Sequence, residues 1–185
     1  MMSQRPLMTG EYAALALLRI RDMYGYEMSH YFEGDELGEV CPIEQSMLYS
    51  YLRNVEQRGL VAWQEERAGQ RPPRKRFSLT ADGTLAVDRW LRQPVGRLRE
   101  VRLDLLLKLY VLHQVNPRAE RRLVQEQVEV CEAYRTKLQA RFDGADDQFE
   151  QLVAGSKLSA AVATLDWLRG YAESLGRNRV AAATA

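Results

Sequence analysis

The sequence of 185 residues is poor in the side chains from which most active sites and covalent cross-links are built. It has two cysteines, Cys41 and Cys131, which lie 90 positions apart, and two histidines, His30 and His113. The cysteine spacing fits neither a disulfide framework nor a metal-binding motif. A nucleophile paired with a base and a glycine-rich phosphate loop are also missing. The sequence therefore predicts neither an enzyme nor a bound cofactor.

One acidic loop does gather several side chains that metals can bind: His30, Asp35, Glu36, Glu39 and Cys41. A single loop rarely organises a metal site, so we predict none here. His113 is expected near the end of a helix, where a positive charge is favoured and a structural role is sufficient.

An excess of one charge and a long apolar run are missing as well. The 26 Lys and Arg residues against 25 Asp and Glu residues give a formal net charge of +1. Any binding of nucleic acid must therefore depend on locally concentrated charge. No cationic and then apolar leader opens the sequence, and the longest apolar stretches, 13–18 and 103–111, are short or interrupted. We expect a cytoplasmic protein with no membrane partner.

Pro94 and Gly96 divide the sequence into two parts. The part before them mixes helical and strand patterns, whereas the part after them is purely helical. We predict a mainly α fold with a small β-wing, made of a mixed domain at 9–93 and a helical domain at 95–178.

Three helices are predicted in the first part, ahead of a β-ribbon. Thr9 is expected to cap the first helix, which runs to about residue 20. The second covers 26–32. The third covers 43–58 and ends at Gly59, a common helix stop.

A β-ribbon follows, with predicted strands at 61–66 and 77–79 and a basic turn at 67–76. A fourth helix, capped by Thr80, runs to about residue 92. The turn has no acid and five cations: Arg67, Arg71, Arg74, Lys75 and Arg76. These cations repel one another unless an anion is nearby, although a solvated loop would also accommodate them. Pro72-Pro73 suits the end of a hairpin because proline cannot donate to a strand ladder.

The third predicted helix has two different faces. Leu48, Leu52 and Val55 form the apolar face. The other face has hydroxyl, amide and guanidinium groups and no acid: Ser46, Tyr49, Ser50, Arg53 and Gln57. Such groups reach base edges and phosphates, although an ordinary solvated face would have the same pattern. A compact helix followed by a basic β-ribbon indicates a winged helix-turn-helix.

Residues 9–93 resemble the N-terminal domain of the PadR family of bacterial transcriptional regulators. Three blocks carry the resemblance, in the order and spacing of the family: Tyr24-Gly25-Tyr26-Glu27, the segment SMLYxxLxxVExxGL at 46–60, and RKRFSLTADG at 74–83. Residues 95–178 resemble, by their layout, the longer helical C-terminal domain of one branch of that family.

The resemblance implies a dimeric regulator, usually a repressor, that binds double-stranded DNA at a palindromic operator near its own gene. It implies these DNA-binding residues: Tyr26, Gln45, Ser46, Tyr49, Ser50, Arg53, Arg71, Arg74, Lys75 and Arg76. Tyr49 and its neighbours would enter the major groove, the run 74–76 would flank it, and Tyr26 would lie near a phosphate. The acidic loop 33–44 would oppose DNA binding if it faced the duplex, so we expect it to lie away from the backbone.

The second part is predicted to contain helices at about 98–112, 117–142 and 156–175. The last helix has an apolar seam with the spacing of a coiled coil: Leu158, Ala161, Leu165, Leu168, Ala172 and Leu175. We expect this seam to hold two copies of the chain together. Trp167 lies one position off the seam and could line an effector pocket with Cys131 and Tyr134, for an aromatic or other ligand. Packing in the dimer is the alternative role for Trp167.

The sequence thus predicts a homodimeric repressor that a small-molecule or protein effector releases from DNA. The alternative is a protein-interaction module, because a winged domain can keep its fold without binding DNA.

Overall fold

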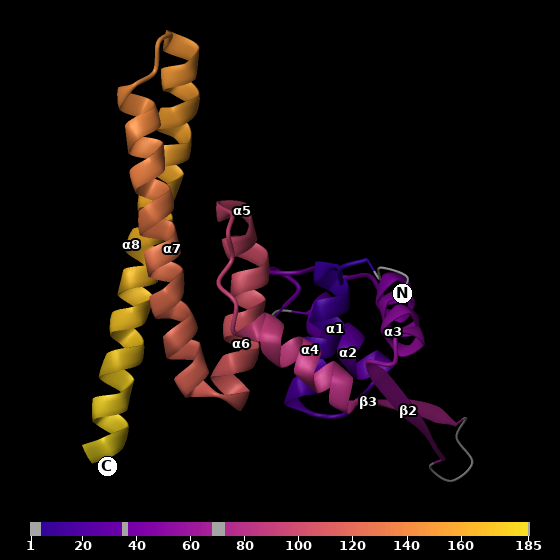
Figure 1. The fold of residues 1–185 in the computed structure, drawn as a ribbon. Helices are drawn as coiled ribbons and strands as arrows, with labels where there is room; N and C mark the ends of the chain where they lie inside the picture. Colours follow the sequence, from indigo (N-terminus) through magenta and orange to yellow (C-terminus); the bar gives the residue numbers. More distant parts are fainter. Residues whose placement is uncertain (1–4, 35–36, 68–72, 185) are drawn as a thin grey trace. The chain divides into compact units, whose positions relative to one another are not determined.

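The computed structural model describes residues 5–34, 37–67 and 73–184, with side chains described to Arg177. The chain divides into two compact units (Figure 1). Unit 1 comprises the residues up to Gln93 and Leu103–Asn116, and unit 2 comprises Pro94–Arg102 and the residues from Pro117 onward. The segment 103–116, which we expected in the second domain, thus belongs to unit 1.

Unit 1 is mainly helical with a small antiparallel sheet, the predicted fold class. Its elements are α1 (Thr9–Ile20), β1 (Met23–Tyr24), α2 (Gly25–Glu33), α3 (Gln45–Gln57), β2 (Val61–Glu66), β3 (Arg74–Leu79), α4 (Ala81–Leu91) and α6 (Leu106–Val115). The sheet has the order β1-β3-β2. Figure 1 shows the β2–β3 hairpin, which we call the wing, extending from the helices.

Helix α1 is the centre of unit 1. Residues 13–18 are an uninterrupted run of Ala and Leu with at most 3% exposure, so this helix is covered on all sides. It packs against α3, α4 and α6. The contact with α6 explains why residues 103–116 belong to unit 1 although they follow the Pro94 break.

Glu11 in the first turn of α1 is fully buried and ties three segments together. Its carboxylate accepts hydrogen bonds from Arg5 at 2.5 and 2.9 Å, from the Met8 N–H at 2.9 Å and from Asn54 of α3 at 3.2 Å. Burial acts to raise the pKa of Glu11, but these hydrogen bonds outweigh it and bring the pKa below its usual value. The chain before α1 is thereby fixed to α3.

Local sequence signals set two of the helix ends in unit 1. Gly59 has φ +72°, the left-handed conformation that stops α3 at low cost. Thr80 caps α4 as predicted, because its Oγ1 accepts the Gly83 N–H at 3.0 Å. The prediction for Thr9 was wrong. Met8 is the residue that precedes α1, and the Thr9 hydroxyl instead donates to Asp104 at 3.0 Å.

The wing is longer than predicted. Strand β3 begins at Arg74, so its ladder with β2 extends from the pair Val61 and Leu79 to the pair Glu66 and Arg74. The short strand β1, which lies between the first two helices, pairs with Phe77 and Arg76 of β3. The three basic residues at the start of β3, at 74–76, therefore each lie opposite a fixed residue of β2.

Unit 2 contains α5 (Leu98–Glu100), α7 (Pro117–Asp143) and α8 (Gln148–Thr184). The helix predicted at 98–112 is interrupted, because a π-helical turn at Val101–Leu105 separates α5 from α6. Helix α8 begins at Gln148 rather than near 156, and Asp147 accepts the Glu150 N–H at 2.8 Å just before its first turn. Helices α7 and α8 form a long hairpin (Figure 1).

Among the described residues, no helix combines the length and the apolar character needed to cross a membrane.

Candidate nucleic-acid interface

Helix α3 separates its apolar and polar side chains as the sequence predicts. Leu48, Leu52 and Val55 have at most 1% exposure and face the core of unit 1. Gln45, Ser46 and Arg53 are exposed, and Tyr49 and Ser50 are half-buried. The polar face is therefore available to a partner along the whole helix.

Three of these polar residues are linked by hydrogen bonds. The Ser50 hydroxyl donates to the Ser46 carbonyl at 3.1 Å, and the Arg53 guanidinium donates to the Ser50 Oγ at 3.0 Å. Within the described residues, Arg53 has no carboxylate partner, so its charge is not neutralised.

Tyr49 lies against the first residue of α2. A Cβ atom at Gly25 would lie 2.7 Å from Cε1 and Oη of Tyr49, so only glycine lets the ring approach this closely. Together they border a cleft of about 360 Å³ between α2, α3 and the wing. Its lining is Tyr24, Gly25, Tyr26, Tyr49, Pro73, Arg74, Lys75 and Phe77. The cleft thus combines three tyrosines with two cations.

Arg74 is held over the cleft by Tyr26. Its guanidinium carbon lies 5.1 Å from the centre of the Tyr26 ring, and its Nη1 donates to the Tyr26 hydroxyl at 3.2 Å. Tyr26 in turn stacks on Tyr24, with ring centres 5.5 Å apart. A cation held by aromatic rings keeps its full charge.

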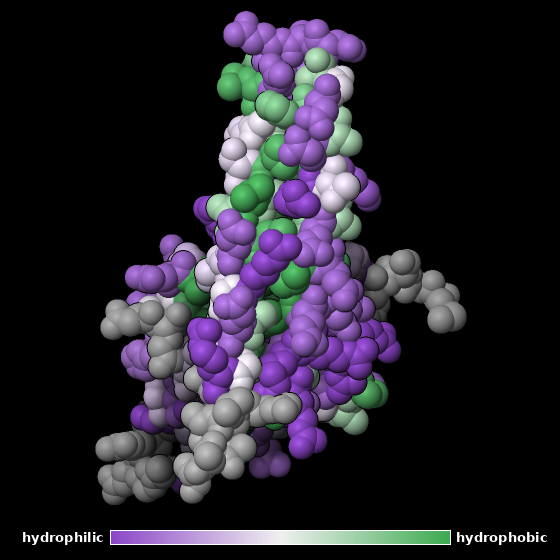
Figure 2. All heavy atoms as spheres, turned by 90° about the vertical axis from the view of Figure 1, so that its left-hand side faces the viewer, coloured by the Kyte–Doolittle hydropathy of each residue, from purple (hydrophilic) through white to green (hydrophobic). Residues whose placement is uncertain are grey.

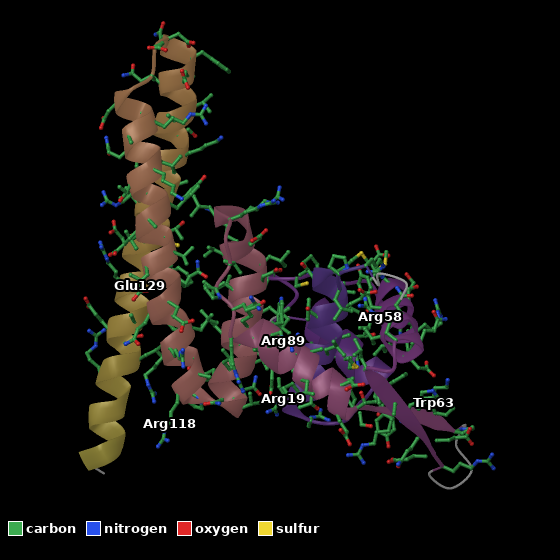
Figure 3. The ribbon with its side chains drawn as sticks, viewed as in Figure 1. Arg19, Arg58, Trp63, Arg89, Arg118 and Glu129 are labelled. Carbon is green, nitrogen blue, oxygen red and sulfur yellow. The ribbon has the colours of Figure 1, made fainter. Side chains whose placement is uncertain are left out.

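Lys75 is held in the same way. Its Nζ lies 3.7 Å from the centre of the Trp63 ring, and the indole N–H donates to Glu56 at 2.6 Å. Figure 3 shows Trp63 on the wing. The Trp63 ring is half-buried and supports Lys75, whereas Trp90 is buried in unit 1.

Other wing cations are neutralised by acids of β2. Arg76 pairs with Glu66 at 3.2 Å, and Arg67 pairs with Glu65 at 3.2 Å. The Tyr24 hydroxyl also donates to Glu66; this hydrogen bond and then Arg76 hold the pKa of Glu66 below its usual value. Among the described wing residues, Arg74 and Lys75 have no carboxylate partner.

The remaining DNA-binding predictions are placed as follows. Arg71 lies outside the described residues. Glu44, at the end of the acidic loop, directly precedes α3 and is exposed beside Gln45.

Sequence reasoning omitted Met47, which is 49% exposed on α3 and could contact a thymine methyl group. Helical spacing was the available signal, because Met47 lies three positions before Ser50 of the polar face.

The seam predicted for dimerisation is covered within the chain itself. Ala161, Leu165 and Leu168 have at most 2% exposure and Leu175 has 8%, while Leu158 and Ala172 are half-buried. Since α7 packs against α8 along the hairpin, the seam faces α7.

The residues predicted for an effector pocket have different surroundings. Cys131 is buried and lies 3.6 Å from the Gln127 amide, and burial raises the pKa of its thiol. Tyr134 is half-buried. Trp167 is 43% exposed and stacks on Tyr171, with ring centres 6.2 Å apart.

Within the part of the chain that the structure describes, no three His, Cys, Asp or Glu side chains are grouped to hold a metal ion. Asp35 and Glu36 of the acidic loop lie outside that part.

The chain is similar to known regulators of transcription. Residues 14–89 match the model of the Transcriptional regulator PadR-like family. Over 149 residues the chain is 26% identical to the Negative transcriptional regulator PadR of Bacillus subtilis (strain 168), covering 80% of this chain and 76% of that protein. The crystal structure of B. subtilis PadR in complex with operator DNA has 22% identity and a TM-score of 0.48, with coverage of 92% and 99%. Its complex with p-coumaric acid has 22% identity and a TM-score of 0.41, with coverage of 94% and 99%.

Proposed function

We propose that this protein regulates transcription by binding DNA through unit 1, whose residues 14–89 match the model of the PadR-like family of transcriptional regulators. One observation supports this most directly. The acid-free face of α3 lies beside a cleft whose two cations, Arg74 and Lys75, have aromatic neighbours and no carboxylate partners among the described residues.

In the proposed complex, α3 enters the major groove, which is wide enough for a helix. Gln45, Ser46 and Tyr49 then face base edges, with Met47 as an apolar contact. Arg53, Arg74 and Lys75 contact phosphates beside the groove. The N-terminus of α2, where Tyr26 lies, adds backbone N–H groups that have no partner within the helix.

We propose that the protein acts as a homodimer through a second face of α8. Phe149, Leu152 and Trp167 are 73%, 67% and 43% exposed on that face, opposite the covered seam. Between Leu152 and Trp167 the face carries small, exposed, uncharged residues, and Gly170 follows Trp167 after three positions: Ser156, Ser159, Ala160, Ala163 and Gly170. Figure 2 shows pale and green residues running along the hairpin between purple ones. Two such faces could pack closely, since small side chains let helices approach.

A dimer of this kind presents two recognition helices to a palindromic operator, one per half-site. We propose that it represses transcription in the cytoplasm, as the name of its B. subtilis relative indicates for that protein, and that an effector lowers its affinity for DNA. We propose no enzymatic role. A module that binds proteins instead of DNA is less well supported, because it would not need the unpaired wing cations.

The test is binding of the purified protein to a labelled fragment from upstream of its own gene, by fluorescence anisotropy across a salt series. We expect affinity at least about a hundredfold above that for scrambled DNA. Equal and weak binding to fragments that tile the flanking intergenic regions would refute the proposal.

A further inference from the structure

Unit 2 has a cleft of about 660 Å³ between the start of α7 and the last part of α8 for which side chains are described. One wall is formed by Arg118, Arg121, Arg122 and Gln125, and the other by Ala172, Leu175 and Gly176. Figure 3 shows Arg118 near the start of α7. No residue of this cleft was part of the site predicted for an effector, and two of them, Ala172 and Leu175, were assigned to the dimer seam.

The cationic wall is a single face of α7. Positions 118, 121, 122 and 125 follow the three- and four-residue spacing that brings side chains to one side of a helix. Arg118 and Arg121 also lie at the N-terminal end of α7, where the helix dipole is positive and further positive charge is unfavourable. An anion in the cleft would relieve both repulsions.

One arginine of this wall, Arg122, is neutralised by a carboxylate, and the other nearby carboxylates have partners outside the wall. Glu126 pairs with Arg122 at 2.8 Å, and Glu173 pairs with Arg177 at 3.8 Å. Glu120 is buried and accepts a hydrogen bond from Tyr171 at 2.5 Å. Among the described residues, no carboxylate pairs with Arg118 or Arg121.

The opposite wall is apolar and leaves room. Ala172 and Gly176 have little or no side chain, and a Cβ atom at Gly176 would meet nothing within 4 Å. Leu175 supplies apolar surface between them. The two walls therefore differ in chemistry. The α7 wall can donate hydrogen bonds to an anion, and the α8 wall offers an apolar surface against which an apolar group can pack.

We propose that this cleft binds an organic anion whose acidic group faces Arg118 and Arg121 and whose apolar body lies on Ala172, Leu175 and Gly176. The volume falls within the range of about 300–1,000 Å³ found for small-molecule sites. The forked guanidinium groups suit a carboxylate or sulfonate, which they bind with paired hydrogen bonds. If the proposed function holds, this cleft is an effector site on the hairpin that carries the dimer face.

The experiment compares two fluorescent probes on the full chain without DNA. 8-Anilinonaphthalene-1-sulfonate carries the acidic group, and N-phenyl-1-naphthylamine has the same aromatic body without it. We expect the double variant Arg118→Ala/Arg121→Ala to weaken saturable binding of the sulfonate at least about tenfold and to leave the neutral probe unchanged, consistent with the loss of charge-assisted hydrogen bonds. Arg99→Ala removes an exposed arginine of the same unit outside the cleft and is the matched control, expected to bind both probes normally.

Gly176→Leu tests the apolar wall separately, because it fills the open space and should weaken binding of the sulfonate without altering charge. Circular dichroism of each variant checks that the helices are retained. Sulfonate binding that is equal in the wild type and the double variant would overturn the proposal. Displacement of the sulfonate by an equal concentration of inorganic phosphate would overturn the requirement for an apolar body. Since no DNA is present, failure here is distinguishable from failure of the proposed function.

Discussion

Replacing Gly25 by alanine should weaken DNA binding by displacing Tyr49 without removing it. The added Cβ would lie 2.7 Å from Cε1 and Oη of Tyr49, against an ordinary contact of about 3.5–4.0 Å. The ring must therefore withdraw by about 1 Å, and it can do so because it is only half-buried.

The size of the effect follows from the base contact that a displaced Tyr49 no longer makes. A good base contact contributes about 1–3 kcal/mol, and a dimer on a palindrome loses one in each half-site, or about 2–6 kcal/mol in all. We expect operator affinity to fall at least about thirtyfold, since each 1.4 kcal/mol is tenfold. Stability should change by less than about 1 kcal/mol, because the core of unit 1 is untouched.

The assay is a double-mutant cycle of Gly25→Ala and Tyr49→Ala, read by anisotropy on the operator fragment, with thermal unfolding as the check on stability. If Gly25 acts through Tyr49, adding Gly25→Ala to Tyr49→Ala should cause little further loss. Fully additive losses, or an operator affinity of Gly25→Ala within twofold of the wild type, would refute the reasoning.

Three further predictions test other parts of the structure. Arg74→Ala/Lys75→Ala should reduce the steepness of the plot of log affinity against log salt by about 3.6, from two phosphate contacts per protomer at about 0.9 each, while the exposed surface variant Arg92→Ala should leave it nearly unchanged. Glu11→Gln should lower the free energy of unfolding by about 1–3 kcal/mol at pH 7, because hydrogen bonds to a charged group are lost. The pKa of Glu11 is lowered in the folded state, so its contribution is present above the unfolded pKa and is lost as pH falls through the folded pKa. Urea unfolding should thus show the variant and the wild type converging in acid, and a constant difference would contradict this. Leu152→Glu/Trp167→Glu should produce monomers in analytical ultracentrifugation with retained helix content, and an unchanged dimer would exclude this face.

Much of unit 1 could be predicted because its signals are local. Gly59 and Thr80 set helix ends through their own backbone or hydroxyl, and the apolar spacing of Leu48, Leu52 and Val55 fixes which side of α3 is buried. These features depend on residues within a few positions of one another. The family resemblance added the roles of the residues on the polar face.

The errors arose where the partner of a residue lies far away in the sequence. Helical spacing shows that α8 has an apolar seam, but it cannot show whether α7 or a second chain covers it. The pairing of Arg76 with Glu66 depends on the register of β2 and β3, so the wing looked more cationic in sequence than it is. The π-helical turn at Val101–Leu105 has no local signal that we recognise.

The aromatic supports of Arg74 and Lys75 have a consequence for the entropy of binding. A long cationic side chain that is free in solution loses conformational freedom when it contacts a phosphate, at a cost of about 0.5–1.5 kcal/mol. Here Tyr26 and Trp63 restrict both side chains before any DNA is present. Part of that loss is therefore incurred when the protein folds, and the wing meets the duplex with these two charges already ordered.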